Sequence, residues 1–250
     1  MGYREYYGQV GYTVRPKQGF FSRIRAFGEG FLDEQQDGTT LTRHAMIGAG
    51  GDGRFASFAR VELARDEFRV GSRMLQRFRP RLILQASPTR AIGNLELVVR
   101  AGDEVDFANA REGSGVNLSL AGTWRPDRHT TVSLTGGLRW LDVDAGAAGS
   151  GRLFTAQSER VRATYMFNAR SFVRVIAQYV QTTRAPSLYT FTVSRKSADL
   201  SLSALFAYKL NWQTVFYAGL GDQTAHHEPT GRLEPAGRQA FAKVSYAWQQ

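Results

Sequence analysis

Apolar and polar side chains alternate with a period of two residues in several segments, and this pattern most constrains what the chain can fold into. In one segment Val116, Leu118, Leu120 and Trp124 share a face, and the residues between them are mostly small or polar. Similar segments are 161–167, 173–179 and 200–206. Because successive side chains of a β-strand point to opposite sides of a sheet, each segment is predicted to be a strand with two unlike faces. No segment has the pattern of a long helix.

Turn signals divide these strands into a regular series. An aromatic residue precedes a Pro or Asn turn at several points, as in 124–127 and 208–211. Tight turns are predicted near residues 16, 51, 88, 127, 169 and 211. The spacing of about 40 residues fits a repeated two-strand unit. The glycine-rich run 48–53 is interpreted as a hairpin turn and not as a phosphate loop, because no Lys-Ser or Lys-Thr follows it. Longer polar connections are predicted at 33–40, 65–72, 102–114, 142–158, 182–196 and 221–237.

Short turns on one rim and long loops on the other are typical of outer-membrane barrels. No run approaches the roughly 18 apolar residues of a membrane helix, which excludes a helical membrane protein. We therefore predict an all-β, antiparallel up-and-down transmembrane β-barrel of about 12–14 strands, as a single domain over residues 1–250. The aromatic residues before the tight turns would form a girdle at the periplasmic interface. Because we count about 13 strands and see no secretion signal, we expect the barrel to be incomplete at its N-terminus.

The net charge of +10 comes mainly from arginines scattered through the predicted strands. Basic residues on the predicted inner faces are Arg139, Arg160, Arg162, Arg174, Lys209 and Lys243, and apolar residues that would face lipid flank them, except that Glu159 precedes Arg160. Near the bilayer midplane, Arg or Lys facing lipid costs about 2–4 kcal/mol, so these side chains are predicted to face the lumen. A cationic lumen would favour anionic solutes. Alternatively, these side chains pair with Glu or Asp across strands and fill a narrow or plugged lumen.

The C-terminus ends on another alternating strand, in which Val244, Tyr246 and Trp248 share one face. This resembles the C-terminal signal that the barrel-insertion machinery recognises, although two Gln residues follow Trp248. An ordinary closing strand is the alternative.

Three segments resemble a poorly characterised family of bacterial outer-membrane barrels: Phe172–Tyr179, Leu205–Gly219 and Phe241–Tyr246. Full-length members of that family carry a carbohydrate-binding-module-like domain before the barrel. The resemblance implies a missing N-terminal domain with a role in glycan handling, and it supplies no catalytic residues.

Signals for enzyme chemistry are weak, and no catalytic residue, cofactor or metal is predicted. His226 and His227 lie in a predicted external loop, and His44 and His129 have no motif partners. The acidic runs 103–106 and 142–144 could bind calcium, although loop decoration is the favoured interpretation. Cysteine is absent, which excludes thiolate sites and disulfides.

The leading hypothesis is a non-enzymatic channel or membrane anchor in the bacterial outer membrane. Its expected partners are outer-membrane lipid, the barrel-insertion machinery and an anionic solute or glycan, and not nucleic acid. Two alternatives stay open: a soluble basic β-protein that binds nucleic acid, suggested by the pI of about 10.2, and an outer-membrane hydrolase that uses His226 or His227.

Overall fold

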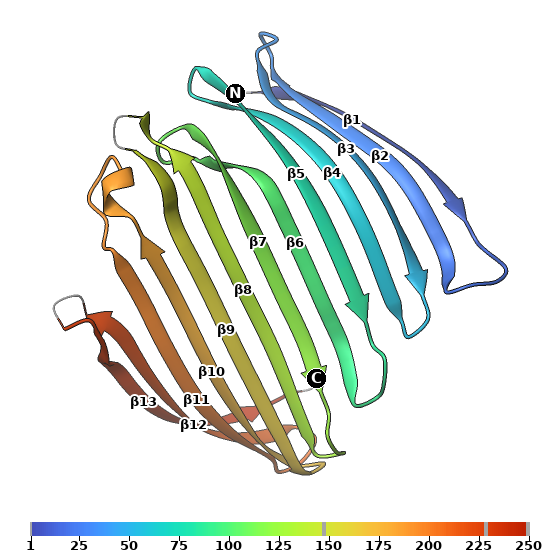
Figure 1. Ribbon diagram of the computed structural model, residues 1–250. Helices are drawn as coiled ribbons and strands as arrows, with labels where there is room; N and C mark the ends of the chain where they lie inside the picture. Colours follow the sequence, from blue (N-terminus) through green and yellow to red (C-terminus); the bar gives the residue numbers. More distant parts are fainter. Residues whose placement is uncertain (1, 147–148, 228–229, 249–250) are drawn as a thin grey trace.

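A computed structural model describes residues 2–146, 149–227 and 230–248, and these form one antiparallel sheet (Figure 1). The sheet has thirteen strands in chain order. The strands are β1 (Tyr3–Val14), β2 (Phe21–Gln35), β3 (Thr40–Gly53), β4 (Ser57–Val70), β5 (Arg73–Ala86), β6 (Ile92–Asp106), β7 (Arg111–Trp124), β8 (Thr130–Asp144), β9 (Ser150–Asn168), β10 (Ser171–Arg184), β11 (Lys196–Lys209), β12 (Thr214–His227) and β13 (Arg232–Tyr246). This order confirms the predicted all-β, antiparallel up-and-down architecture.

The sheet is open in this structure. Within the described ranges, β1 pairs only with β2 and β13 pairs only with β12. Because adjacent strands are antiparallel and their number is odd, β1 and β13 run in the same direction. The chain accordingly starts at one rim of the curved sheet and ends at the other (Figure 1). In the same described ranges, no helix is long and apolar enough to cross a membrane.

The connections are short on both rims, so the predicted asymmetry between turns and long loops is wrong. The first rim holds connections 15–20, 54–56, 87–91, 125–129, 169–170 and 210–213. The second rim holds connections 36–39, 71–72, 107–110, 145–149, 185–195 and 228–231. The strands have 12 to 19 residues, and their polar ends stay in the hydrogen-bonded ladder where loops were predicted. Of the connections predicted to be long, only 182–196 stays close to its predicted length; parts of two others, residues 147–148 and 228–229, lie outside the described residues.

Three turns on the first rim are built in the same way. A side-chain oxygen of Asp127, Asn168 or Asn211 accepts hydrogen bonds from the backbone N–H groups two and three residues later. Asx side chains stabilise turns by such bonds. In Asp127 these bonds hold the pKa of the carboxyl below its usual value. The turns predicted near 127, 169 and 211 are therefore confirmed, and these side-chain hydrogen bonds stabilise them.

The glycine-rich run 48–53 was predicted to be a hairpin turn, and this is wrong, because it forms the end of β3 and the turn follows at 54–56. The glycines allow neighbouring strands to pack closely there. A Cβ atom on Gly48 would lie 2.7 Å from the Phe27 ring, and one on Gly50 would lie 2.6 Å from the Ala59 carbonyl oxygen. This run is therefore a packing feature of the sheet.

A small apolar core lies at the second rim. It consists of Leu141, Val143, Leu153 and Leu188, all buried. Leu188 belongs to a 3-10 turn, η2 (Pro186–Leu188), in the connection between β10 and β11. The Leu188 carbonyl accepts a 2.6 Å hydrogen bond from Arg111 of β7, which ties this connection across the ends of several strands.

Gly50→Ala should lower the free energy of unfolding by about 1–3 kcal/mol, because the new methyl group meets backbone that cannot move freely. Gly136→Ala is the matched control, since the nearest atom to its added Cβ is 3.9 Å away. Denaturant unfolding followed by tryptophan fluorescence measures both. Equal midpoints for the two variants would contradict the close packing at β3.

Candidate functional site: the two faces of the sheet

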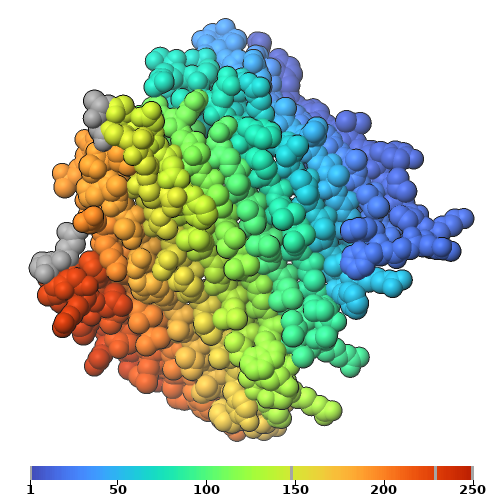
Figure 2. Space-filling view, viewed as in Figure 1, coloured from blue at the N-terminus to red at the C-terminus, as the bar shows by residue number. Residues whose placement is uncertain are grey.

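The strand register sorts the side chains into two faces. The apolar face carries large hydrophobic side chains that are half or more exposed, such as Val10 (76%), Ile47 (63%), Leu134 (53%) and Leu220 (64%). Side chains of successive strands form one continuous surface from β1 to β13 (Figure 2). Soluble monomers rarely expose an apolar patch of more than a few hundred Å², so this face requires an apolar environment.

An aromatic belt follows the first rim on the apolar face. Its members are Tyr12, Trp124, Tyr165, Tyr208 and Tyr246, and each lies in the last residues of its strand. Another large aromatic residue of this face, Trp140 of β8, lies nearer the second rim. Its cross-strand partner is Val116, and Val116 precedes Trp124 by eight residues in β7. At the usual rise of a strand, eight residues span about 27 Å, and strand tilt shortens this to about 20 Å. The distance is close to the height of the apolar band of a membrane barrel.

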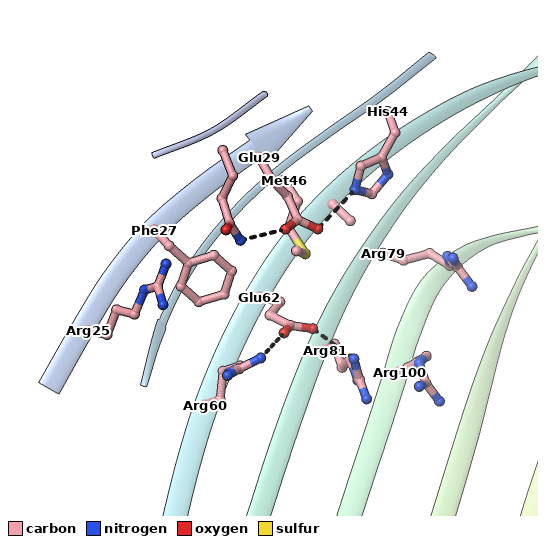
Figure 3. A pocket seen from close by; sticks show the side chains of 12 residues that line it. Arg25, Phe27, Glu29, His44, Met46, Arg60, Glu62, Arg79, Arg81 and Arg100 are labelled. Atoms are coloured by element: carbon pink, nitrogen blue, oxygen red, sulfur yellow. Dashed lines mark hydrogen bonds and ion pairs between the residues drawn. The ribbon is translucent and has the colours of Figure 1, made fainter. Parts of the chain in front are cut away.

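The polar face is hollowed beside β1 to β6 (Figure 3). The hollow has a volume of about 510 Å³, and side chains from six neighbouring strands line it. The lining residues are Gln9, Arg25, Phe27, Glu29, His44, Met46, Arg60, Glu62, Ala64, Arg79, Arg81 and Arg100. Five of these are arginines and two are glutamates, so the lining carries an excess of three positive charges if His44 is neutral.

Glu62 holds two of these arginines. One of its carboxylate oxygens accepts a hydrogen bond from Arg60 at 3.2 Å, and the other accepts one from Arg81 at 3.1 Å (Figure 3). The Glu62 side chain is only 5% exposed. The guanidinium group of Arg60 also lies over the rings of Phe27 and Phe58, which limits its rotation.

Asp66 is the second buried acid of this face. It contacts Nδ1 of His44 at 2.5 Å, Arg77 at 2.8 Å and Arg79 at 3.2 Å. The His44 ring stacks on Phe31, with 4.9 Å between the ring centroids. Arg79 lies 3.8 Å from Glu104, which is itself 3.8 Å from Arg139. Acids of β4 and β6 are therefore linked to arginines of β5 and β8.

The six basic residues predicted to face a lumen all lie on the polar face by register and alternation. They differ in their partners. Among the described residues, Arg139 has an acidic partner, whereas Arg160, Arg162 and Arg174 of β9 and β10 have none within 4.0 Å. Lys209 and Lys243 lie towards the first rim, also without one. One of these arginines is thus paired with an acid and three have no acidic partner among the described residues, and whether they face an open or a filled lumen stays a prediction.

The arginines of β4 to β6 were missed in the sequence. Arg77, Arg79 and Arg81 follow one another at every second position, and this spacing places all three on one face of β5. Their acidic partners, Glu62 and Asp66, lie four residues apart on β4 and therefore on one face as well. The same period-two pattern could have identified this network.

Two other predictions about site residues need correction. His226 and His227 were placed in an external loop, but they end β12, where the alternation of the strand turns them to opposite faces. The acidic runs 103–106 and 142–144 were also placed in loops, but they lie in β6 and β8. Asp106 and Asp142 pair with Arg111 and Arg152 there. Within the described part of the chain, no group of three His, Cys, Asp or Glu residues could hold a metal ion.

Val244 and Tyr246 lie on the apolar face of β13, and Trp248 follows the end of the strand. All three are exposed, and the Tyr246 and Trp248 rings meet edge to face at 6.2 Å. Their role as an insertion signal stays a prediction.

No protein-family model matches this chain, and no curated protein matches it in sequence. Among solved structures the chain is similar to one described as "NanC porin structure in rhombohedral crystal form", with 7% sequence identity, a TM-score of 0.35, and coverage of 97% of this chain and 99% of that chain. The fold is defined by this chain's own strand pairing. The resemblance to barrels with a carbohydrate-binding-module-like domain stays a hypothesis.

Glu62→Gln should lower the free energy of unfolding by about 1.5–3 kcal/mol, because it removes charge-assisted hydrogen bonds to two arginines. Glu67→Gln is the control, because Glu67 pairs with the exposed Arg43 and Arg65 on the other face of the same strand. Glu67→Gln should lower the free energy of unfolding by at most about 1 kcal/mol. Denaturant titration of both variants measures the difference, and a smaller loss for Glu62→Gln would contradict a structural role of the buried acid.

Proposed function

We propose that this chain forms the wall of a non-enzymatic channel in a bacterial outer membrane. In this proposal the apolar face contacts lipid and the polar face lines an aqueous path for anionic solutes. The observation that carries the proposal is the separation of side chains over thirteen strands, with exposed hydrophobic residues on one face and arginines in excess on the other.

The apolar face supports the membrane part of the proposal. Its exposed aliphatic side chains would gain from burial in lipid, by roughly 25 cal/mol for each Å² removed from water. The aromatic belt at the first rim would lie at the headgroup level, where Tyr and Trp are enriched. In a bilayer every backbone group also needs a partner, so the open edges of β1 and β13 must be paired there. Because these two strands run in the same direction, pairing one directly with the other would form a parallel ladder.

The polar face supports the choice of anions. Arg160, Arg162 and Arg174, which have no acidic partner within 4.0 Å in the described part of the chain, lie on the neighbouring strands β9 and β10, where they would raise the local concentration of anions. An acidic glycan would benefit from this charge, whereas a neutral glycan would not. The exposed Val244, Tyr246 and Trp248 at the end of the chain suit recognition by the insertion machinery before the strand is buried in lipid.

The proposal is tested by the ion selectivity of detergent-refolded protein in planar bilayers. Under a KCl gradient, the sign of the reversal potential should show a preference for chloride over potassium. Replacing Arg160, Arg162 and Arg174 together with Gln should reduce that preference strongly, because it removes three positive charges from the conducting path.

Replacing Arg125, Arg128 and Arg170 with Gln is the matched control. It removes the same charge from turns of the first rim and should change selectivity much less. Cation selectivity of the unmodified protein would contradict the anionic path. Absence of any conductance, with protein that stays dispersed without detergent, would contradict the membrane location.

A further inference from the structure

Three arginines meet at one point of the polar face. Arg79 and Arg81 lie on β5, and Arg100 of β6 is the direct cross-strand partner of Arg81. Figure 3 shows the three side chains at the same side of the hollow. Like charges opposite one another in a sheet are destabilising, so this arrangement needs a compensating negative charge.

The acidic side chains around these arginines do not balance their positive charge. Glu62, Asp66 and Glu104 contact Arg60, Arg77, Arg79, Arg81 and Arg139. With Arg100, for which no carboxylate lies within 4.0 Å among the described residues, the cluster has six positive and three negative side chains. The cluster, on β4, β5, β6 and β8, therefore has an excess of three positive charges.

Unused hydrogen-bond donors lie at the same point. The Nε atoms of Arg79 and Arg81 are buried, and neither has a hydrogen-bond partner in the described part of the chain. Their terminal nitrogens contact Asp66, Glu104 and Glu62, so the acids already hold both guanidinium groups in place. Buried donors without a partner are costly, and a bound acceptor would remove that cost.

We propose that Arg79, Arg81 and Arg100 form a binding site for a doubly charged oxyanion, such as a phosphate or sulfate group. Guanidinium groups bind such groups through parallel N–H donors, and a dianion offers enough oxygens for several of them. A dianion would reduce the local excess from three positive charges to one, whereas a carboxylate would leave two. The site deepens the proposed function by naming a class of anion that this part of the face selects.

The test is binding of inorganic phosphate to the refolded full chain in detergent, measured by calorimetry at constant ionic strength. We expect saturable binding, with acetate binding more weakly. Arg100→Gln should weaken phosphate binding about tenfold or more, because this arginine has no competing carboxylate. Arg100→Lys should recover only part of the loss, because an ammonium group keeps the charge but not the paired donors.

Arg25→Gln is the matched control. Arg25 lines the same hollow and also has no carboxylate within 4.0 Å among the described residues, but it lies on β2, away from the cluster. This variant should bind phosphate nearly as well as the unmodified protein. Equal weakening by Arg25→Gln and Arg100→Gln would show only a general field effect and would overturn the site, and so would acetate binding as tight as phosphate binding.

Failure of this site and failure of the channel can be separated. Phosphate binding that depends on Arg100 in a protein without conductance would support the site and contradict the channel. Anion-selective conductance without phosphate binding would support the channel and overturn the site.

Discussion

The rest of the structure depends on the backbone ladder that joins thirteen strands in chain order. Because every strand is paired in register with its neighbours, the two-residue period of the sequence becomes two continuous surfaces. A shift of one residue in β5 would move Arg77, Arg79 and Arg81 to the apolar face. On the polar face the register is held by the close approach of β3 at Gly48 and Gly50 and by ion pairs such as that of Glu62 with Arg81.

The charged network of the polar face has a structural and a functional part. Glu62 and Asp66 are buried and fix the arginines of β4 and β5 in defined positions. Arg100, Arg160 and Arg162 have no carboxylate within 4.0 Å among the described residues, and in the proposed channel their charge would be available to a solute. The arginines held by acids would offer hydrogen-bond donors in fixed positions. The arginines without an acidic partner would add net positive charge. Together they would select anions both by charge and by geometry.

The strands and their faces could be predicted from the sequence because alternation depends on neighbouring residues. Arg139, Arg160 and Arg174 were placed on their face in this way. The strand ends could not be predicted, because polar residues such as Asp103 and Asp142 favour loops locally and form strands here through cross-strand pairing with Ser114 and Arg152. The same holds for Gly48 and Gly50, whose close contacts join different strands. The cluster around Arg100 depends on the register between β5 and β6, which no local pattern contains.

In the proposed channel, lipid covers one face of the sheet and water covers the other. The chain has no cysteine, so single cysteines at positions 117, 118, 119 and 120 of β7 can be compared without background. In lipid vesicles, a water-soluble maleimide should modify Asn117→Cys and Ser119→Cys, while Leu118→Cys and Leu120→Cys should be protected until detergent is added. Equal modification of all four positions in vesicles would show that lipid does not cover the face that carries Leu118 and Leu120.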